Sequence, residues 1–500
     1  MKRAGNTAIT SADSKSTPPI VLLLLTAAVV YLVLLFIIFI TRASYPFELE
    51  WMEGGAVDHV ARVLHGQTIY VPPTIEFVPY IYTPLYYYVS ALVALITGIG
   101  FLPLRLVSVL STLGVLVVLY QFARRETGNW RYGLIAAGLY AAAFKLCGAW
   151  FDIGRADSLF VFLLILGVYK LRYSQVSRDF ILAAVLLWLA FLAKQTAAMA
   201  TAPLLLAALY QHRNRALPFV LSYVILIAAS VIFLDIVHDS WFSYYIFKLP
   251  AMHKNDSGQY LGFWVHDIAR GLPAIFLLSV LTIATAWRTN RRTGSVFYAS
   301  LLLGCLATSW SSRFHAGGYD NALMPLCAIL TLPAVLALKE LPRGPQKTSK
   351  GIVANVLLPL VLLAQFGLFW YNPVSQIPTS VVESSGATIT QTISKMPGEL
   401  YMPYHGFLPT LAGKSSYAQQ MAFKYLVQAD TILGKELTAS LDSAYTSQRF
   451  ALVILDSPSP DPAMNQAYIE YRNMPDAVMT FWPLTGMPTR PRFWYVPRPR

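Results

Sequence analysis

The chain has 500 residues, of which 56% are hydrophobic and only 13% are charged. Soluble domains carry about 25% charged residues, so this composition excludes an ordinary soluble protein and predicts a chain largely surrounded by lipid. The net charge of +13 does not indicate nucleic-acid binding, because Lys and Arg gather in the cytoplasmic loops of membrane proteins. We therefore expect the lipid bilayer as a partner and no nucleic acid.

The N-terminus is a polar, basic stretch followed by a long apolar segment. Residues 20–40 are long enough to cross the roughly 30 Å hydrocarbon core of a bilayer. A cleaved signal peptide has a shorter apolar core and a small-residue cleavage site. We therefore expect an uncleaved first span, with residues 1–19 as a cytoplasmic tail.

Ten further apolar segments follow the first one. They lie at about 102–123, 132–150, 157–171, 180–193, 196–211, 216–237, 272–287, 295–311, 321–338 and 352–371. Basic clusters occupy every second connection, and such clusters remain in the cytoplasm. The sequence thus predicts a polytopic α-helical membrane protein with about eleven transmembrane helices and a cytoplasmic N-terminus.

Residues 82–100 are the ambiguous segment. If they crossed the membrane, Arg124, Arg125 and every later basic cluster would face outward. We therefore expect an outward interfacial or re-entrant helix there, with its tyrosines at the depth of the lipid headgroups. A twelfth span is the alternative.

The last part of the chain, residues 372–500, has a different composition. It is richer in polar residues and is long enough for a small domain. Apolar runs at 400–403 and 450–456 predict buried strands, and 382–396 and 419–433 predict helices. We expect a small extracytoplasmic α/β domain.

Charged residues gather on the outward side of this topology. The loop at 42–101 carries Glu48, Glu50 and Glu53, and the motif FDIGRAD supplies Arg155 and Asp157. Ionisable residues near membrane depth are costly, which makes them functional candidates. A carboxylate can take a proton from an acceptor hydroxyl, and cations can hold a phosphate. The outward cations include Lys194, Arg270 and Arg313.

Each candidate also has a structural interpretation. The three glutamates could form a solvated loop, Asp157 could be a helix N-cap, and Lys194 could be an interfacial lysine whose ammonium reaches water. The carboxylates could also bind a divalent metal ion, but no fixed ligand spacing is present.

Several motifs recur in the order that one superfamily shows. They are Met52-Glu53, Pro84-Leu85-Tyr86-Tyr87, Arg105-Leu106-Val107-Ser108, Asp157 in GRADSLF, Lys194 between two apolar segments, and Tyr319 followed by Pro325. In these motifs residues 20–371 resemble the GT-C superfamily of polyprenyl-phosphate-dependent glycosyltransferases, in the branch of protein O-mannosyltransferases and lipid A aminoarabinose transferases. One departure is Met52, which stands where the family has an aspartate; Glu50 or Glu48 could replace that carboxylate.

The resemblance implies a GT-C-like catalytic domain over 20–371, with its catalytic loop at 42–101. It implies a glycosyltransferase of the plasma (inner) membrane that moves a sugar from a polyprenyl-phosphate donor to a glycan, lipid or protein acceptor on the non-cytoplasmic side, with inversion. No cofactor is expected, and a divalent metal is not favoured. A secondary transporter or flippase of a glycan or lipid-linked substrate is the alternative.

The implied site residues fall into two groups. The catalytic candidates are Glu53, Glu50 and Asp157. The candidates for substrate binding are Glu48, Tyr86, Arg155, Lys194, Arg270, Arg313 and Tyr319.

Overall fold

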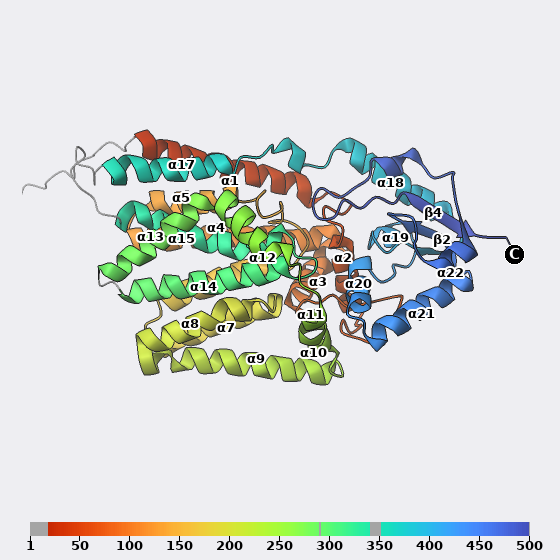
Figure 1. Ribbon diagram of the computed structural model, residues 1–500, viewed down its shortest axis with the longest axis horizontal. Helices are drawn as coiled ribbons and strands as arrows, with labels where there is room; N and C mark the ends of the chain where they lie inside the picture. The colour runs from red at the N-terminus through yellow and green to blue at the C-terminus, as the bar shows by residue number, and fades with distance from the viewer. Residues whose placement is uncertain (1–18, 290–291, 341–351, 500) are drawn as a thin grey trace, which may run out of the picture.

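A bundle of long helices forms one part of the protein, and a region containing a β-sheet caps one end of it (Figure 1). The structure, a computed structural model, describes residues 19–289, 292–340 and 352–499. The predicted tail at 1–19 therefore lies almost entirely outside the described residues.

Each of the eleven segments predicted to span the membrane contains a helix of the bundle. These helices are α1 (Pro19–Ala43), α4 (Phe101–Thr127), α5 (Trp130–Ala142), α6 (Asp157–Arg172), α7 (Ser177–Ala193), α8 (Ala197–His212), α9 (Leu217–Val237), α13 (Pro273–Arg288), α14 (Arg292–Phe314), α15 (Met324–Glu340) and α17 (Leu358–Leu368). Helix α15 lies at the centre of the bundle, whereas α9 lies at its edge with its apolar side chains exposed. An apolar exposed surface of this kind is suited to lipid.

Fewer of these helices meet a strict test of length and hydropathy. Among the described residues, four helical stretches are long and apolar enough to cross a membrane: Pro19–Ala43, Phe101–Thr127, Ala197–Val237 and Asp320–Lys339. A fifth is obtained if Gly258–Gly271 and Pro273–Arg288, which meet at 92°, are taken as one bent span. The number of crossings stays a prediction.

The segment predicted to be helical at 132–150 ends early. Helix α5 stops at Ala142, and the following residues form turns that close with left-handed backbone at Gly148 (φ +73°) and Ala149 (φ +56°). Phe144, Cys147 and Trp150 are buried in this turn region. The apolar run therefore reflects packing in the protein interior and not continued contact with lipid.

The basic connections do meet at one end of the bundle. Arg172 Nε contacts Glu126 Oε1 at 2.9 Å, and Lys339 Nζ donates to the carbonyl of Glu126 at 2.9 Å. Gln211 donates to the carbonyl of Thr293 at 2.8 Å. These contacts join the ends of α4, α6, α8, α14 and α15 far from the C-terminal region (Figure 1). The shared side agrees with the predicted topology, and its cytoplasmic location stays a prediction.

Short helices form the opposite end of the bundle. The outward loop contains α2 (Glu53–Leu64) and α3 (Leu85–Thr97). Helix α3 has 13 residues, about 20 Å, which is shorter than the hydrocarbon core. Leu92, Leu95 and Ile96 are 66%, 70% and 89% exposed, so one apolar face is free to meet lipid, as an interfacial helix requires.

A second set of short helical elements lies between α9 and α13. It comprises α10 (Trp241–Ser243), η2 (Tyr244–Lys248), α11 (Leu249–Met252), α12 (Gly258–Gly262) and η3 (Phe263–Gly271). Elements α10 and α11 lie at the same end of the molecule as α2 and α3 (Figure 1).

The C-terminal region, residues 372–499, contains the predicted strands and helices. Its sheet has the order β1-β2-β4-β3, with β1 and β2 parallel and the other pairs antiparallel. The run FALVIL in β2 is almost wholly buried, as expected for a strand covered on both faces. Its elements are α18 (Ser380–Lys395), β1 (Glu399–Tyr401), α19 (Leu408–Leu411), α20 (Gln420–Gln428), α21 (Ile432–Thr446), β2 (Phe450–Leu455), α22 (Pro462–Ala467), β3 (Tyr468–Glu470) and β4 (Phe493–Pro497).

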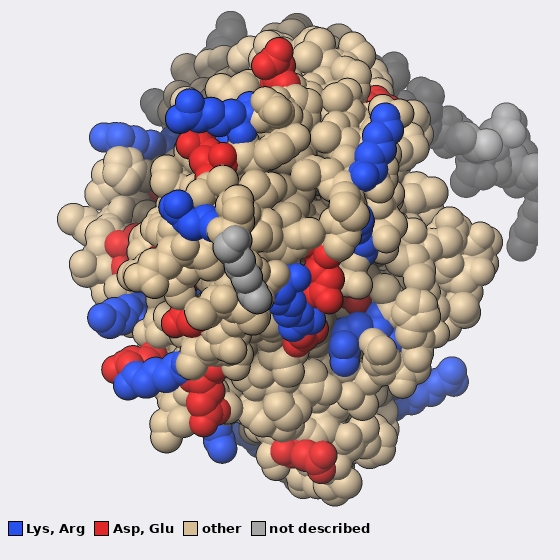
Figure 2. Space-filling view, turned by 90° about the vertical axis from the view of Figure 1, so that its right-hand side faces the viewer, with Lys and Arg blue, Asp and Glu red and all other residues tan. Residues whose placement is uncertain are grey.

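The face at the C-terminal end carries scattered charges of both signs (Figure 2). Such a mixed surface is typical of contact with water. It contrasts with the apolar outer surface of α9 and α3, and it indicates that this end of the protein projects from the membrane.

Candidate active site

The three glutamates of the outward loop are buried. Glu48, Glu50 and Glu53 are 2%, 1% and 0% exposed, which excludes the solvated-loop interpretation. Each one meets a different cationic partner: His405, Arg155 and Arg105, respectively. Burying a charge is costly unless it is paired, so these partners account for the burial.

Glu53 is held by four donors. Arg105 of α4 contacts it through Nε to Oε1 at 2.9 Å and through Nη2 to Oε2 at 2.7 Å. The N–H groups of Leu49 and Gly154 donate to the same two oxygens at 2.9 and 2.7 Å. Burial alone would raise the pKa of Glu53, but Arg105 and the two N–H groups lower it below its ordinary value. Glu53 is therefore ionised, and its acceptor positions are occupied.

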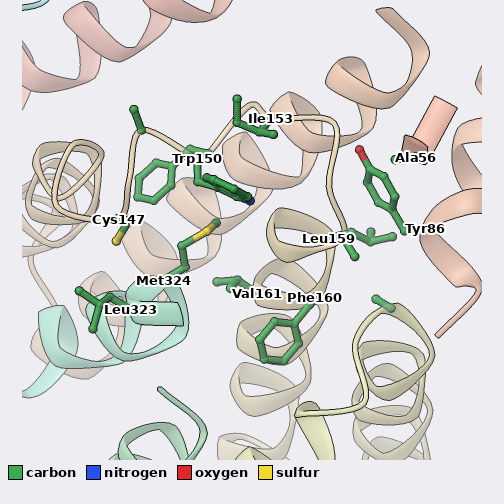
Figure 3. Close-up of a cluster of buried hydrophobic side chains, with 14 of the residues drawn as sticks. Ala56, Tyr86, Cys147, Trp150, Ile153, Leu159, Phe160, Val161, Leu323 and Met324 are labelled. Atoms are coloured by element: carbon green, nitrogen blue, oxygen red, sulfur yellow. The ribbon is translucent and has the colours of Figure 1, made fainter. Parts of the chain in front are cut away.

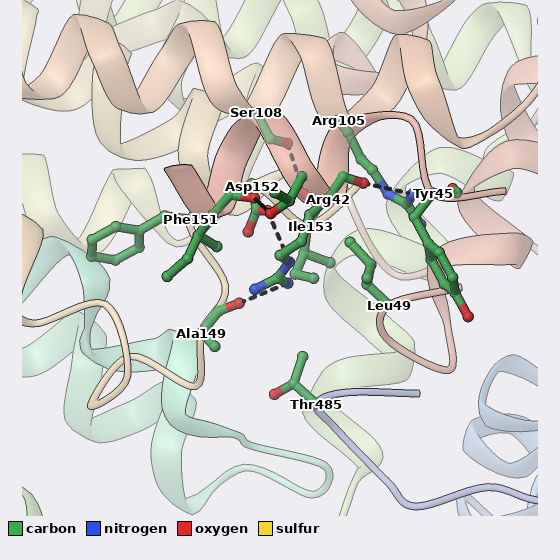
Figure 4. Close-up of polar contacts among 12 residues, drawn as sticks. Arg42, Tyr45, Leu49, Arg105, Ser108, Ala149, Phe151, Asp152, Ile153 and Thr485 are labelled. Atoms are coloured by element: carbon green, nitrogen blue, oxygen red, sulfur yellow. Dashed lines mark hydrogen bonds and ion pairs between the residues drawn. The ribbon is translucent and has the colours of Figure 1, made fainter. Parts of the chain in front are cut away.

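The pair of Arg42 and Asp152 lies next to Glu53 and Arg105, and we call these four residues the clamp. Figure 4 shows Arg42, Asp152 and Arg105. Arg42 Nε lies 3.0 Å from Asp152 Oδ2, and both side chains are almost fully buried. Arg105 also donates to the backbone carbonyl of Tyr45. The clamp thus joins α1, α4 and the loop before α6, and fixes the start of the outward loop.

Glu50 is equally buried but has fewer hydrogen-bond donors than Glu53. Its Oε2 accepts a hydrogen bond from Arg155 Nη1 at 2.8 Å, and Arg155 Nη2 donates to the hydroxyl of Tyr82 at 2.9 Å. Burial raises the pKa of Glu50 to about 7, against the opposing effects of Arg155 and of the backbone N–H of Met52. A carboxylate with this pKa is able to exchange a proton near neutral pH.

Asp157 and Lys194 form a second buried carboxylate–cation pair. Lys194 Nζ lies 2.6 Å from Asp157 Oδ1, which also accepts from Asn321 Nδ2 at 3.1 Å. Trp150 Nε1 donates to Asp157 Oδ2 at 3.0 Å. Asp157 makes no capping bond to α6, and Lys194 is only 11% exposed. The structure therefore supports neither the helix N-cap nor the water-reaching lysine.

A cavity of about 240 Å³ lies beside the two pairs. Lys194 lies in its wall directly, and Arg155 reaches it through Tyr82. Tyr319 also lines it and contacts the hydroxyl of Thr485 at 3.1 Å between oxygens, which links the wall to the C-terminal region. The lining residues include Tyr82, Lys194, Gln195, Thr196, Ser312, His315, Tyr319, Asn321 and Tyr425.

Buried apolar side chains pack against the residues of this site. Trp150, Phe160 and Met324 belong to the apolar cluster in Figure 3, and all three are buried. Charges beside such side chains interact more strongly than they would in water. The pair of Asp157 and Lys194 therefore lies between the apolar core and the cavity.

Five of the seven predicted substrate-binding residues do not line the cavity. Glu48 and Arg155 are buried in the pairs described above, and the other three lie elsewhere. Tyr86 is fully buried and donates to the carbonyl of Leu104 at 2.8 Å. Arg313 is paired with Asp267 at 2.9 Å and with Asp320 at 2.7 Å. Arg270 is exposed, and its Nη1 lies 3.2 Å from His266 Nδ1.

Sequence reasoning assigned no role to Arg105, Asn321, Tyr82 or His405. Arg105 carried a usable signal, because a cation within an apolar helix is expensive unless it is paired. Tyr82 and His405 lie in loops and Asn321 lies in the short helix η4 (Asp320–Leu323), where no spacing indicated a partner.

The described residues contain no group of three or more His, Cys, Asp or Glu side chains arranged to hold a metal ion. The buried carboxylates described above pair with Arg, Lys or His instead.

Comparison with known proteins addresses the fold directly. Residues 81–241 match the family described as dolichyl-phosphate-mannose-protein mannosyltransferase. The structure is similar to ArnT from Cupriavidus metallidurans bound to undecaprenyl phosphate, with a TM-score of 0.62 and 14% identity over 94% of this chain and 97% of the other. The chain has the GT-C fold. Its long apolar helices and this shared fold make it an integral membrane protein, as the sequence predicts.

Two further structures share the GT-C fold with this chain. ArnT of the same organism in the apo state gives a TM-score of 0.59 and 13% identity, covering 94% of this chain and 97% of the other. The oligosaccharyltransferase of Archaeoglobus fulgidus in complex with Zn and sulfate gives 0.50 and 12%, covering 86% and 67%. No curated protein matches the chain in sequence. These comparisons do not favour the transporter or flippase alternative.

Proposed function

We propose that this GT-C protein transfers a sugar from a polyprenyl-phosphate donor to a glycan, lipid or protein acceptor. The observation that carries the proposal is a set of two neighbouring carboxylate–cation pairs beside one cavity. Lys194, paired with Asp157, lines the cavity, and Arg155, paired with Glu50, donates to Tyr82 of its wall. The similar ArnT structure contains undecaprenyl phosphate, which supports a lipid phosphate as the donor.

Lys194 and Arg155 would hold the donor phosphate. Lys194 lines the cavity and already contacts one carboxylate oxygen, so its ammonium can turn to a phosphate oxygen while Asp157 keeps Asn321 and Trp150 as donors. Charge-assisted hydrogen bonds to an anion are about twice as strong as neutral ones. The same two cations would stabilise the phosphate as the leaving group.

Glu50 would be the general base. We prefer it to Glu53, the first candidate from the sequence, because the oxygens of Glu53 are occupied by Arg105 and two N–H groups. The pKa of about 7 suits a base at neutral pH. Glu53 would then position the segment that carries Glu50.

The step balances as a single displacement. The acceptor hydroxyl gives its proton to Glu50, and its oxygen forms a bond to the anomeric carbon. The bond from that carbon to the phosphate oxygen breaks, and polyprenyl phosphate leaves with the electron pair. Attack on the face opposite the phosphate inverts the anomeric configuration. No cofactor takes part.

We also propose that the cavity and the C-terminal region lie outside the cytoplasm, at the plasma (inner) membrane. Arg124→Cys should then react with a membrane-impermeant thiol reagent only from the cytoplasm, and Lys435→Cys only from outside. The three native cysteines are buried and should contribute no background. The opposite labelling pattern would contradict this orientation.

The test of the function is a comparison of lipids and glycans in strains with and without this protein. A polyprenyl-phosphate sugar should accumulate when the protein is absent, and one sugar should be missing from a glycan, lipid or protein. In a donor-consumption assay, the protein is added back and the loss of the accumulated polyprenyl-phosphate sugar is measured. Unchanged polyprenyl-phosphate sugars in the deletion strain would contradict the proposal.

A further inference from the structure

A buried charged triad joins the outward loop to the C-terminal region. His405 is 0% exposed, and its Nδ1 forms a hydrogen bond with Glu48 Oε1. Its Nε2 lies 3.3 Å from Asp456 Oδ1. Burial would lower the pKa of His405, but the charges of Asp456 and Glu48 raise it to about 10. The histidine is therefore protonated at neutral pH and lies between two acidic side chains.

The topology of the sheet brings this triad together. His405 follows β1 and Asp456 directly follows β2, and these two strands are parallel neighbours. Their carboxyl ends therefore lie at one edge of the sheet, and that edge faces Glu48. Edges of this kind are where open sheets with parallel strands place functional groups.

The contact at this edge is very close. A Cβ atom on Gly54 would lie 1.7 Å from the carbonyl oxygen of Gly406, and one on Gly406 would lie 2.6 Å from the nitrogen of Gly55. The turn that carries His405 is thus seated on the first residues of α2. Glycine is needed on both sides of the contact because no other residue leaves this space.

The segment of the outward loop that contains Glu48 is held at a second point. The N–H of Thr485 donates to the carbonyl of Leu49 at 3.1 Å, and Thr485 forms a parallel bridge with Glu50. Residues 48–50 are therefore fixed by His405 at one end and by Thr485 at the other. Glu50 is two residues from Glu48 in this segment, so its carboxylate depends on the same support.

We propose that His405 is a positioning residue for sugar transfer: held by Asp456, it fixes Glu48 and through the segment 48–50 orients Glu50 toward the cavity. The C-terminal region is then a part of the transfer site and not a separate module. This inference rests on the proposed function.

The test compares two contacts that both join the outward loop to the C-terminal region. His405→Gln removes the cation of the triad. The matched control, Arg449→Gln, breaks the ion pair between Arg449 Nη1 and Glu76 Oε1, which measures 2.8 Å and is partly exposed. The variants are purified, and their rates are expressed per mole of folded protein. Donor consumption gives kcat and KM, and native mass spectrometry measures the binding of undecaprenyl phosphate.

His405→Gln should lower kcat at least tenfold while the KM for the donor and the binding of undecaprenyl phosphate stay within twofold. Arg449→Gln should keep kcat within twofold of the unsubstituted protein. The double variant Glu48→Gln/His405→Gln should be no slower than His405→Gln alone, because both changes remove the same support.

Wild-type kcat in His405→Gln, or equal losses in His405→Gln and Arg449→Gln, would overturn the inference. If His405→Gln does not fold, Asp456→Asn and Glu48→Gln apply the same test, since each removes one member of the triad. Failure of the proposed function gives a different result: the unsubstituted protein itself would consume no polyprenyl-phosphate sugar and bind no undecaprenyl phosphate.

Discussion

Two buried acidic regions lie side by side in this protein, and they differ in how completely their charges are satisfied. In the clamp, Glu53 receives four hydrogen bonds from Arg105 and two backbone groups, and no oxygen is left for a ligand. Beside the cavity, Arg155 and Lys194 each hold one carboxylate; Lys194 lines the cavity, and Arg155 donates to Tyr82 of its wall. Burial alone therefore does not separate the two regions, and we base the proposed roles on incomplete pairing beside the cavity.

The comparison predicts opposite phenotypes for the two regions. Changes in the clamp should affect folding, because Glu53 and Arg105 are 0% exposed and water cannot replace the lost cation. Changes around the cavity should affect transfer and leave folding nearly intact, because Lys194 lines the cavity and Asp157 keeps two donors there.

The largest effect is expected for Arg105→Ala. It leaves Glu53 charged and buried, and breaking a buried pair in this way costs about 3–5 kcal/mol. That is a large fraction of the roughly 5–15 kcal/mol that stabilises a typical domain. Folded protein should be lost, as measured by monodisperse yield in detergent and by the thermal unfolding midpoint. A variant with the midpoint of the unsubstituted protein would show that the clamp is dispensable.

Lys194→Met should separate transfer from folding. Asp157 keeps Asn321 and Trp150 as donors, so the unfolding midpoint should change little. Donor consumption should fall at least about 100-fold, equivalent to about 2.7 kcal/mol of lost phosphate stabilisation. Lys194→Arg is the matched control and should retain part of the rate. Full activity in Lys194→Met would remove this lysine from the phosphate site.

The architecture was largely predictable from the sequence. Hydropathy identified all eleven bundle segments, because lipid contact requires long apolar runs. It failed at 143–150, where an equally apolar run packs inside the protein as turns after α5. Hydropathy records that a residue avoids water and does not distinguish lipid from a protein core.

The site was predictable only in part. The sequence identified Glu50, Arg155, Asp157, Lys194 and Tyr319, which the structure brings together around or beside the cavity. It could not rank Glu50 against Glu53, because their partners come from residues about 100 and 50 positions away. Which arginine meets which glutamate is decided by helix packing and leaves no local pattern.

The pH dependence of transfer gives an intermediate effect. Glu50 has a raised pKa of about 7, so it becomes protonated as the pH falls below that value and can no longer accept a proton. The kcat/KM for the donor should fall about tenfold per pH unit below about 7 and level off above it. Burial also raises the pKa of Asp58 to about 7, so Asp58→Asn is the control. This variant should show the same fall in kcat/KM at low pH. A flat profile between pH 5 and 8 would argue against Glu50 as the base.

The smallest effect is expected for metal removal. The site carboxylates pair with Arg, Lys or His, so a chelator should leave donor consumption within about twofold. The measurement is the initial rate with EDTA, with EDTA plus excess Mg²⁺ as the control. A loss that Mg²⁺ restores would contradict this expectation.

The most direct measurement of the central claim is donor consumption by Glu50→Gln. This change keeps the size of the side chain and removes the base, so undecaprenyl phosphate should still bind while kcat falls by about 1,000-fold or more, on the order of 4 kcal/mol. A Glu50→Gln protein that consumes the donor within tenfold of the unsubstituted rate would contradict the account.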